Sequence, residues 1–141
     1  MADFSSRKMT DADWPSIKNF GKDEFNYPAE MGYEFVVWLD EVRHRAGVPM
    51  HLVSDHRPPE RNAAAGGASK SAHMDLPCNA IDIGQRPTLP DPNWTRHRFR
   101  IIKAAMDAGC VRIGMYPSGS LHLDRAESTH PSPCLWIVAK P

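Results

Sequence analysis

The sequence contains few cysteines, and none are spaced as a reactive or metal-binding pair. Cys78, Cys110 and Cys134 form no C-x-x-C motif, and their odd number leaves at least one thiol free even in an oxidising compartment. We therefore expect reduced thiols. The chain has 141 residues, enough to bury a core without relying on disulfides, so one domain over residues 1–141 is expected.

The sequence also lacks an excess of either charge and any long apolar run. Lysine and arginine together number 17, and so do aspartate and glutamate, which leaves no global field to gather nucleic acid or anionic lipid. No stretch approaches the roughly 18 apolar residues of a membrane span. The start, MADFSSRKMTDADWPSIKNF, has no apolar core flanked by basic residues. We expect no nucleic-acid partner, no membrane span and no Sec signal.

Two segments have the periodicity of amphipathic helices. Apolar residues recur at intervals of three and four over residues 31–46, and Gly47 follows as a stop. A second helix is expected over residues 94–108, with Gly109 as its stop. The residues expected to face the core are Met31, Phe35, Trp38, Leu39, Val42 and Ala46 in the first helix, and Ile101, Ile102, Ala105 and Met106 in the second.

Short apolar or alternating segments predict strands. They lie at residues 50–53, 79–84, 111–116, 120–124 and 134–138. Pro117, Ser118 and Gly119 are expected to form a hairpin turn between the third and the fourth. The long stretch SDHRPPERNAAAGGASKS reads as a loop with one helical turn near residues 60–65.

Polar side chains interrupt two of these strands on one face. In NAIDIG, Asp82 alternates with Ile81 and Ile83, and in SLHLD both His122 and Asp124 lie opposite the leucines. If the two strands are neighbours in one sheet, His73, Asp82 and His122 can converge on one cation. Two imidazoles and a carboxylate are ligands that Zn²⁺ accepts, and three protein ligands leave a position for water. Zinc lowers the pKa of bound water toward about 7, so hydrolysis is the expected chemistry.

The order of several motifs resembles the zinc D-alanyl-D-alanine carboxypeptidase family. The motifs are S-x-x-R (54–57), Asn62, the glycine pair 66–67, S-x-H (71–73), A-x-D (80–82) and H-x-D (122–124). The resemblance covers about residues 20–125. The family includes phage endolysins that cut peptidoglycan peptides, and GMYPSGSLHLD is most similar to its murein endopeptidase branch. It implies an α+β fold: a small, mainly antiparallel central sheet with helices packed on one side and the metal site on the open face.

The resemblance also assigns roles to individual residues. It implies one Zn²⁺ per chain, held by His73, Asp82 and His122, and it makes Arg57 the cation that holds the substrate carbonyl or oxyanion. A guanidinium suits that role because it stabilises negative charge without giving up a proton. Ser71 is expected to contact the substrate, which the resemblance identifies as a stem or cross-link peptide of peptidoglycan containing D-amino acids.

The sequence departs from the family pattern at two places. The family usually has a shorter step, containing a glycine, between the S-x-H histidine and the aspartate, whereas here His73 and Asp82 are nine residues apart. Several relatives carry an acid three positions before the last histidine as general base, and here that position is Gly119. Asp124 is the best substitute as catalytic base, and it could equally orient His122 or Arg57. Asp75 in the lengthened segment is the next candidate.

Three classes of function follow from these patterns. The first is a zinc peptidase that cuts peptidoglycan peptides as an endopeptidase or carboxypeptidase, for which a phage lysin is one setting. The second is an inactive relative that serves as a wall-binding or virion structural module. The third, the weakest, is a cysteine hydrolase that pairs Cys78 or Cys134 with His122. A monomer is favoured, made in the cytoplasm without a Sec signal and reaching the wall by lysis, through a holin or within a virion.

Overall fold

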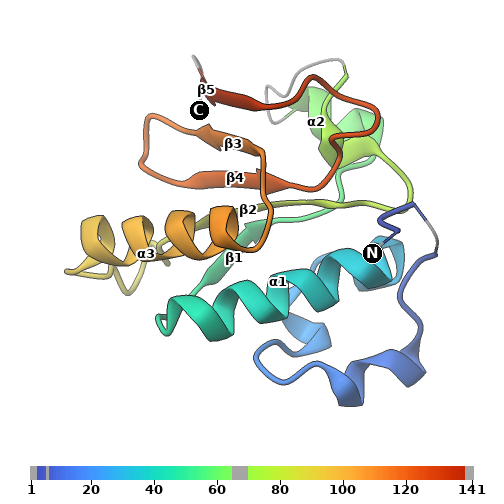
Figure 1. Ribbon diagram of the computed structural model, residues 1–141, viewed down its shortest axis with the longest axis horizontal. Helices are drawn as coiled ribbons and strands as arrows, with labels where there is room; N and C mark the ends of the chain where they lie inside the picture. The colour runs from blue at the N-terminus through green and yellow to red at the C-terminus, as the bar shows by residue number, and fades with distance from the viewer. Residues whose placement is uncertain (1–2, 6, 65–69, 139–141) are drawn as a thin grey trace.

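The fold is built on a five-stranded sheet. The computed structural model describes residues 3–5, 7–64 and 70–138. In spatial order the strands run β1-β2-β4-β3-β5, and every pair of neighbours is antiparallel except β3 and β5, which are parallel (Figure 1). Their bounds are β1 His51–Ser54, β2 Ala80–Gly84, β3 Arg112–Met115, β4 Leu121–Asp124 and β5 Cys134–Ile137.

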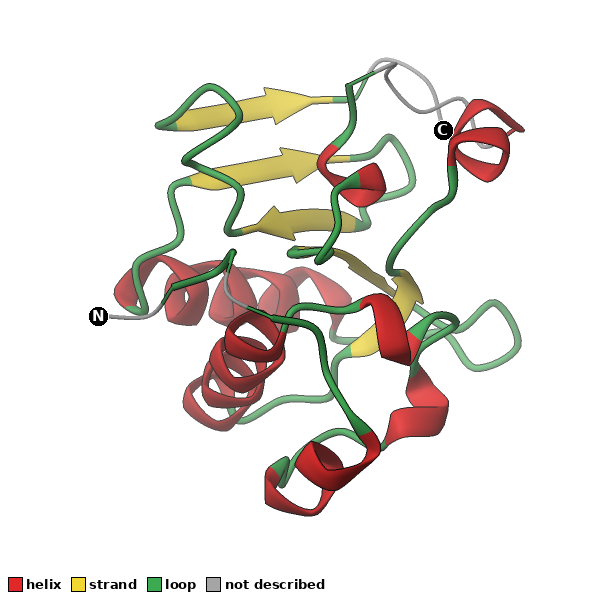
Figure 2. Cartoon of the chain, turned by 90° about the vertical axis from the view of Figure 1, so that its right-hand side faces the viewer, coloured by secondary structure: helices red, strands yellow, loops and turns green. Residues whose placement is uncertain are grey.

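Two long helices, α1 (Tyr33–Ala46) and α3 (Trp94–Asp107), pack against each other on one side of the sheet (Figures 1 and 2). The short helix α2 spans Pro59–Ala64. The described residues also contain four short 3₁₀ helices: η1 Asp11–Ser16, η2 Lys22–Glu24, η3 Pro28–Glu30 and η4 Ala72–Met74. The predicted α+β fold class, with a mainly antiparallel sheet and helices, is confirmed.

The core lies between the helices and the apolar face of the sheet. Leu121 and Leu123 in β4 pair with Ile83 and Ile81 in β2, and all four side chains are fully buried. Because side chains alternate between the two faces of a strand, His122 and Asp124 must point to the other face. The hydrophobic pattern of β4 therefore determines which way its polar residues point.

The helix predictions hold except for one side chain. The apolar stripe of α1 is buried as expected, and Gly47 ends the helix in the left-handed conformation at φ 65°. Met106 was expected in the core but is 58% exposed, whereas Ala104 is buried. At 100° per residue Met106 lies about 140° around α3 from the buried Ile101, so that expectation was wrong.

None of the described helices is long and apolar enough to cross a membrane.

Candidate metal centre

One cross-strand row places two of the predicted ligands side by side. Asp82 in β2 pairs directly with His122 in β4, which pairs in turn with Gly114 in β3. Directly opposed residues in antiparallel strands have their Cβ atoms about 4.5–5.5 Å apart on the same face. The register of the sheet therefore brings the carboxylate and the imidazole together without any contribution from a loop.

The third predicted ligand comes from η4, which packs against the sheet. The Ser71 side chain caps this turn by accepting the backbone N–H of His73 at 3.2 Å. The backbone N–H of Arg57 donates to the His73 carbonyl at 2.8 Å. Two neighbours that the sequence motifs singled out thus hold His73 in place. The contact seen for Ser71 is this cap, and its predicted role toward substrate stays a prediction.

Three ligand atoms converge in a buried position. His73 Nε2 lies 3.1 Å from Asp82 Oδ1 and 3.1 Å from His122 Nδ1, and His122 Nδ1 lies 3.2 Å from Asp82 Oδ1. The three residues are 1%, 4% and 5% exposed. They form a group that could hold a metal ion. The structure thus brings together the three residues that the sequence singled out as ligands.

The outer ring nitrogens of both histidines already have partners. His73 Nδ1 contacts the Asp55 carbonyl at 2.7 Å, and this nitrogen must donate because a carbonyl only accepts. His122 Nε2 lies 2.6 Å from Asp124 Oδ2, a carboxylate that likewise accepts. In the neutral rings, the inner nitrogens therefore carry lone pairs. Two such lone pairs and a carboxylate oxygen meet with no donor among them, an arrangement that fits a bound cation.

The pKa values of the two histidines shift in opposite directions, and burial lowers that of His73. Burial alone would lower the pKa of His122, but its hydrogen bonds to Asp124 and Asp82 outweigh burial and raise that pKa. Burial alone would raise the pKa of Asp82, but His73 and His122 outweigh it and hold that pKa well below its usual range. Asp82 therefore keeps its negative charge beside the two imidazoles.

Asp124 contacts the ligand His122 and is not among the residues that line the cavity beside Asp82. Its side chain is fully buried, and it accepts from His122 Nε2, from Arg112 Nε at 2.7 Å and from the Ala126 backbone N–H at 3.0 Å. Every one of these contacts points into the protein. This placement favours the role in which Asp124 orients His122 over the role of catalytic base. Its action as a base stays a prediction.

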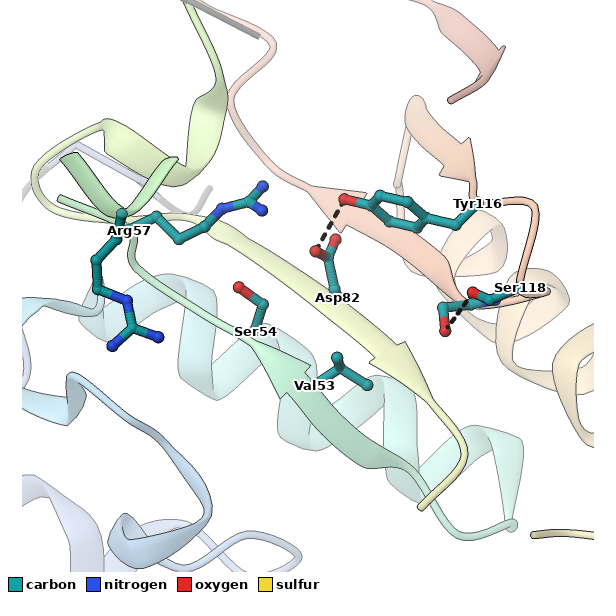
Figure 3. A pocket seen from close by; sticks show the side chains of 8 residues that line it. Val53, Ser54, Arg57, Asp82, Tyr116 and Ser118 are labelled. Carbon is teal, nitrogen blue, oxygen red and sulfur yellow. Dashed lines mark hydrogen bonds between the residues drawn. The ribbon is translucent and has the colours of Figure 1, made fainter. Parts of the chain in front are cut away.

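A cavity of about 300 Å³ opens beside the ligands on the Asp82 side (Figure 3). The side chains of Arg57 and Tyr116 lie on opposite sides of Asp82 in this view. Arg57 Nε is buried and has no hydrogen-bond partner among the described residues. The lining residues are Val53, Ser54, Arg57, Arg61, Asp82, Tyr116, Ser118 and Ser120. Arg57 therefore lines the same cavity as the ligand Asp82, and its predicted role toward the substrate stays a prediction.

Tyr116 is a member of this site that the sequence analysis did not identify. Its hydroxyl donates to Asp82 Oδ2 at 2.8 Å, the oxygen that faces away from the histidines. Burial, followed by the charge of Asp82, raises the pKa of Tyr116 above its ordinary value, so the hydroxyl keeps its proton. The sequence does contain a signal for this residue. Alternation along the strand places Tyr116, one residue past the end of β3, on the same face as Arg112 and Gly114.

The lengthened segment between His73 and Asp82 does not cross the cavity. Cys78 pairs with the segment before α1: its N–H donates to the Glu30 carbonyl at 2.9 Å, and its carbonyl accepts from Gly32 at 2.8 Å. Asp75 Oδ2 contacts His130 Nε2 at 2.9 Å and is not among the residues that line the cavity. The extra length is thus anchored against the chain ahead of α1.

The glycine that stands where some relatives have an acid is required by the hairpin turn. Gly119 has φ 90°, a conformation that L side chains rarely adopt. Its N–H donates to the Tyr116 carbonyl, and the Tyr116 N–H donates to the Ser120 carbonyl, both at 2.9 Å. An aspartate or glutamate at this position would be strained, so the turn geometry itself excludes a base there.

The cysteine-hydrolase alternative loses its support. Cys78 is fully buried, and burial raises the pKa of its thiol to about 12, so almost no thiolate forms at neutral pH. Cys134 lies on β5 opposite Arg112, and no hydrogen bond joins it to His122 among the described residues. Neither thiol is positioned for activation by that histidine.

Two imidazoles and a carboxylate beside an open cavity define a metal-dependent hydrolase rather than a structural metal site. The chain belongs to the family Peptidase M15, the zinc D-alanyl-D-alanine carboxypeptidases, which its sequence matches over residues 18–124. That span includes His73, Asp82 and His122, and membership in the family identifies a metallopeptidase. A search of curated proteins finds no match to the chain.

Removal of either histidine should abolish stoichiometric zinc binding. The wild-type protein is expected to bind close to one zinc per chain, because three donors converge on one position. His73→Ala and His122→Ala should lose it, because two remaining ligands bind far more weakly. Elemental analysis after dialysis measures the occupancy, and His44→Ala, an exposed histidine on α1, is the matched control. Full occupancy in both site variants would exclude this ligand set.

Replacement of Asp124 tests whether it orients His122. Asp124→Asn keeps the size of the side chain but removes the charge that accepts from both His122 and Arg112, so zinc affinity should fall about 10- to 100-fold. Competition against a chelating dye measures this change. Asp75→Asn, which removes a carboxylate paired with His130 away from the ligands, should bind zinc like the wild type. Unchanged affinity in Asp124→Asn would show that the contact has no orienting role.

Proposed function

We propose that the protein is a zinc-dependent peptidase that hydrolyses D-amino-acid-containing peptides of bacterial peptidoglycan, as an endopeptidase or a carboxypeptidase. The family supports a zinc peptidase that acts on peptidoglycan peptides in general. The observation that carries the proposal is the convergence of His73 Nε2, His122 Nδ1 and Asp82 Oδ1 beside the cavity lined by Arg57. When bound there, zinc would supply a Lewis acid that polarises a carbonyl and activates water.

The protein's own groups match the charge changes of peptide hydrolysis. Attack of water on the peptide carbonyl places negative charge on its oxygen before the C–N bond breaks and the amine leaves. The Arg57 guanidinium lines the cavity and has an unpartnered Nε, so it has donor capacity for that oxygen. The Tyr116 hydroxyl lies in the same cavity, where its one proton is donated to Asp82 Oδ2 and so holds that carboxylate in place.

The electrostatics of the cavity suit an acidic peptide. Arg57 and Arg61 both line it, and the single acid among its described lining residues is Asp82, which faces the metal ligands. Neither arginine forms an ion pair with the described residues. Stem peptides of peptidoglycan carry free carboxylates, which guanidinium groups bind well. The two arginines therefore support a substrate with a carboxylate near the bond that is cut.

The setting in which the enzyme acts is a further part of the proposal. We infer a phage lysin, reaching the wall by lysis, through a holin or within a virion, because the family that the chain resembles includes phage endolysins. The alternative of an inactive wall-binding module depended on Gly119. The turn conformation accounts for that glycine without reference to activity, so it carries less weight.

A digest of purified sacculi tests the activity. The zinc-loaded protein should release soluble peptides, and a chelator should stop the release because hydrolysis needs the metal. Mass spectrometry of the fragments identifies the bond: loss of one terminal D-amino acid marks a carboxypeptidase, and separation of cross-linked stems marks an endopeptidase. Binding to sacculi with no release, in protein that carries full zinc, would instead establish the inactive module.

Arg57 is expected to act on turnover and not on metal binding. Arg57→Ala should lower kcat by a factor on the order of a hundred or more, because it removes a charged donor to the developing oxyanion. Arg57→Lys should recover part of the loss, since lysine has the charge but not the planar fork. Arg100→Ala, on the exposed side of α3, is the matched control. Wild-type kinetics in Arg57→Ala would remove this residue from the reaction.

A further inference from the structure

The row that carries the ligands continues beyond β4 to the edge of the sheet. His122 pairs with Gly114 in β3, and Gly114 pairs with Trp136 in β5, which lies at the edge beyond β3 (Figure 1). Asp82, His122, Gly114 and Trp136 thus occupy successive strands in one register. The fourth member belongs to a strand that follows the span matched by the family, residues 18–124.

Gly114, the glycine in this row, leaves room over β3 for the indole of Trp136. A methyl group built on Gly114 would lie 2.7 Å from Cε2 and Nε1 of Trp136, closer than real Cβ atoms approach their neighbours. The Trp136 ring therefore occupies the space over β3 that a side chain at residue 114 would fill. It reaches across β3 to β4, where its centroid lies 5.2 Å from that of His122, with an interplanar angle of 51°.

The same indole contacts the hydrogen-bonded network behind His122. Arg112 Cζ lies 5.0 Å from the Trp136 ring centroid, within range of a cation–π interaction. Arg112 Nε donates to Asp124 Oδ1, and Asp124 Oδ2 accepts from His122 Nε2. Trp136, Arg112, Asp124 and His122 therefore form a closed ring of contacts on the metal face. Arg112 also donates through Nη1 to the Pro131 carbonyl, which ties the segment before β5 to this ring.

We propose that Trp136, reaching over Gly114, is a positioning residue for the metal ligand His122. The flat indole limits rotation of the imidazole and covers the hydrogen bonds that hold its outer nitrogen. A ligand whose direction is fixed before metal binding loses less freedom on binding, so Trp136 raises metal affinity without touching the metal. The functional unit therefore extends beyond Asp124 to include β5.

Three variants test this role through metal binding. Trp136→Ala removes the ring, and Trp136→Phe keeps a smaller flat ring. Gly114→Ala keeps the tryptophan but places a methyl group in the space that its indole occupies. Affinity for Co²⁺, titrated into the metal-free full chain, should fall about 10- to 100-fold in Trp136→Ala and Gly114→Ala and less in Trp136→Phe. The visible absorption spectrum of bound Co²⁺ should also change, because the spectrum reports the geometry of the ligands. A variant that only lost global stability would keep the wild-type spectrum.

The matched control is Leu135→Ala on the same strand. Leu135 is 75% exposed and points to the opposite face from Trp136, so its removal should leave Co²⁺ affinity and spectrum unchanged. Tryptophan fluorescence provides a second readout that needs only the conservative variant. Co²⁺ should quench part of the wild-type tryptophan emission, and this quenched part should be missing in Trp136→Phe. It should be retained in Trp14→Phe, the control, because the ring of Trp14 packs on Phe25.

The outcomes separate this inference from the proposed function on which it rests. Wild-type protein that binds no Co²⁺ would overturn the ligand set and the proposed function with it. Normal binding by the wild type, with equal affinity and spectrum in folded Trp136→Ala and Gly114→Ala, would overturn the positioning role alone. If those two variants do not fold, Trp136→Phe decides, and wild-type affinity, spectrum and quenching there overturn the proposal. Peptidase activity is not needed for any of these measurements.

Discussion

The meeting of three acceptor atoms at His73, Asp82 and His122 is the interaction on which this site depends. Buried acceptors without a donor lose their contacts with water and gain nothing in exchange, so such a cluster destabilises a protein that holds no cation. The cluster is maintained because each imidazole is anchored from behind, by the Asp55 carbonyl and the Asp124 carboxylate. Metal binding relieves the cost, and by linkage it stabilises the folded chain.

Sheet register is the constraint that makes this cluster possible. The pairing of Leu121 and Leu123 with isoleucines of β2 puts His122 opposite Asp82 on the other face. A slip of one residue in β4 would turn both leucines toward the metal and send His122 into the apolar core. The burial energy of the core therefore selects the same register that the metal needs. Fold stability and ligand geometry are specified by one hydrophobic pattern.

The family resemblance supplied the α+β class and the set of three ligands, whereas the alternation of polar and apolar residues was enough to predict most of the strands. It failed where packing depends on partners that the sequence does not name. Tyr116 falls within the predicted strand 111–116, but that pattern does not say which strands lie beside it, so its contact with Asp82 could not be predicted. Trp136 reaches His122 because β5 pairs in parallel with β3 and because residue 114 is glycine. Neither the pairing partner nor the gap can be read from the local pattern of β5.

The departures from the family pattern show which parts of the site tolerate change. The extra residues after His73 are held against residues 30–32 by the backbone bonds of Cys78, and His73 and Asp82 at the two ends of this segment still meet. Gly119 satisfies a turn that an acid would strain. With Asp124 buried and Tyr116 protonated, Asp82 is the one carboxylate among the described residues lining the cavity. The hairpin therefore brings no acid to the site through Gly119, and the charged side chains among the described residues that line the cavity are Arg57, Arg61 and Asp82.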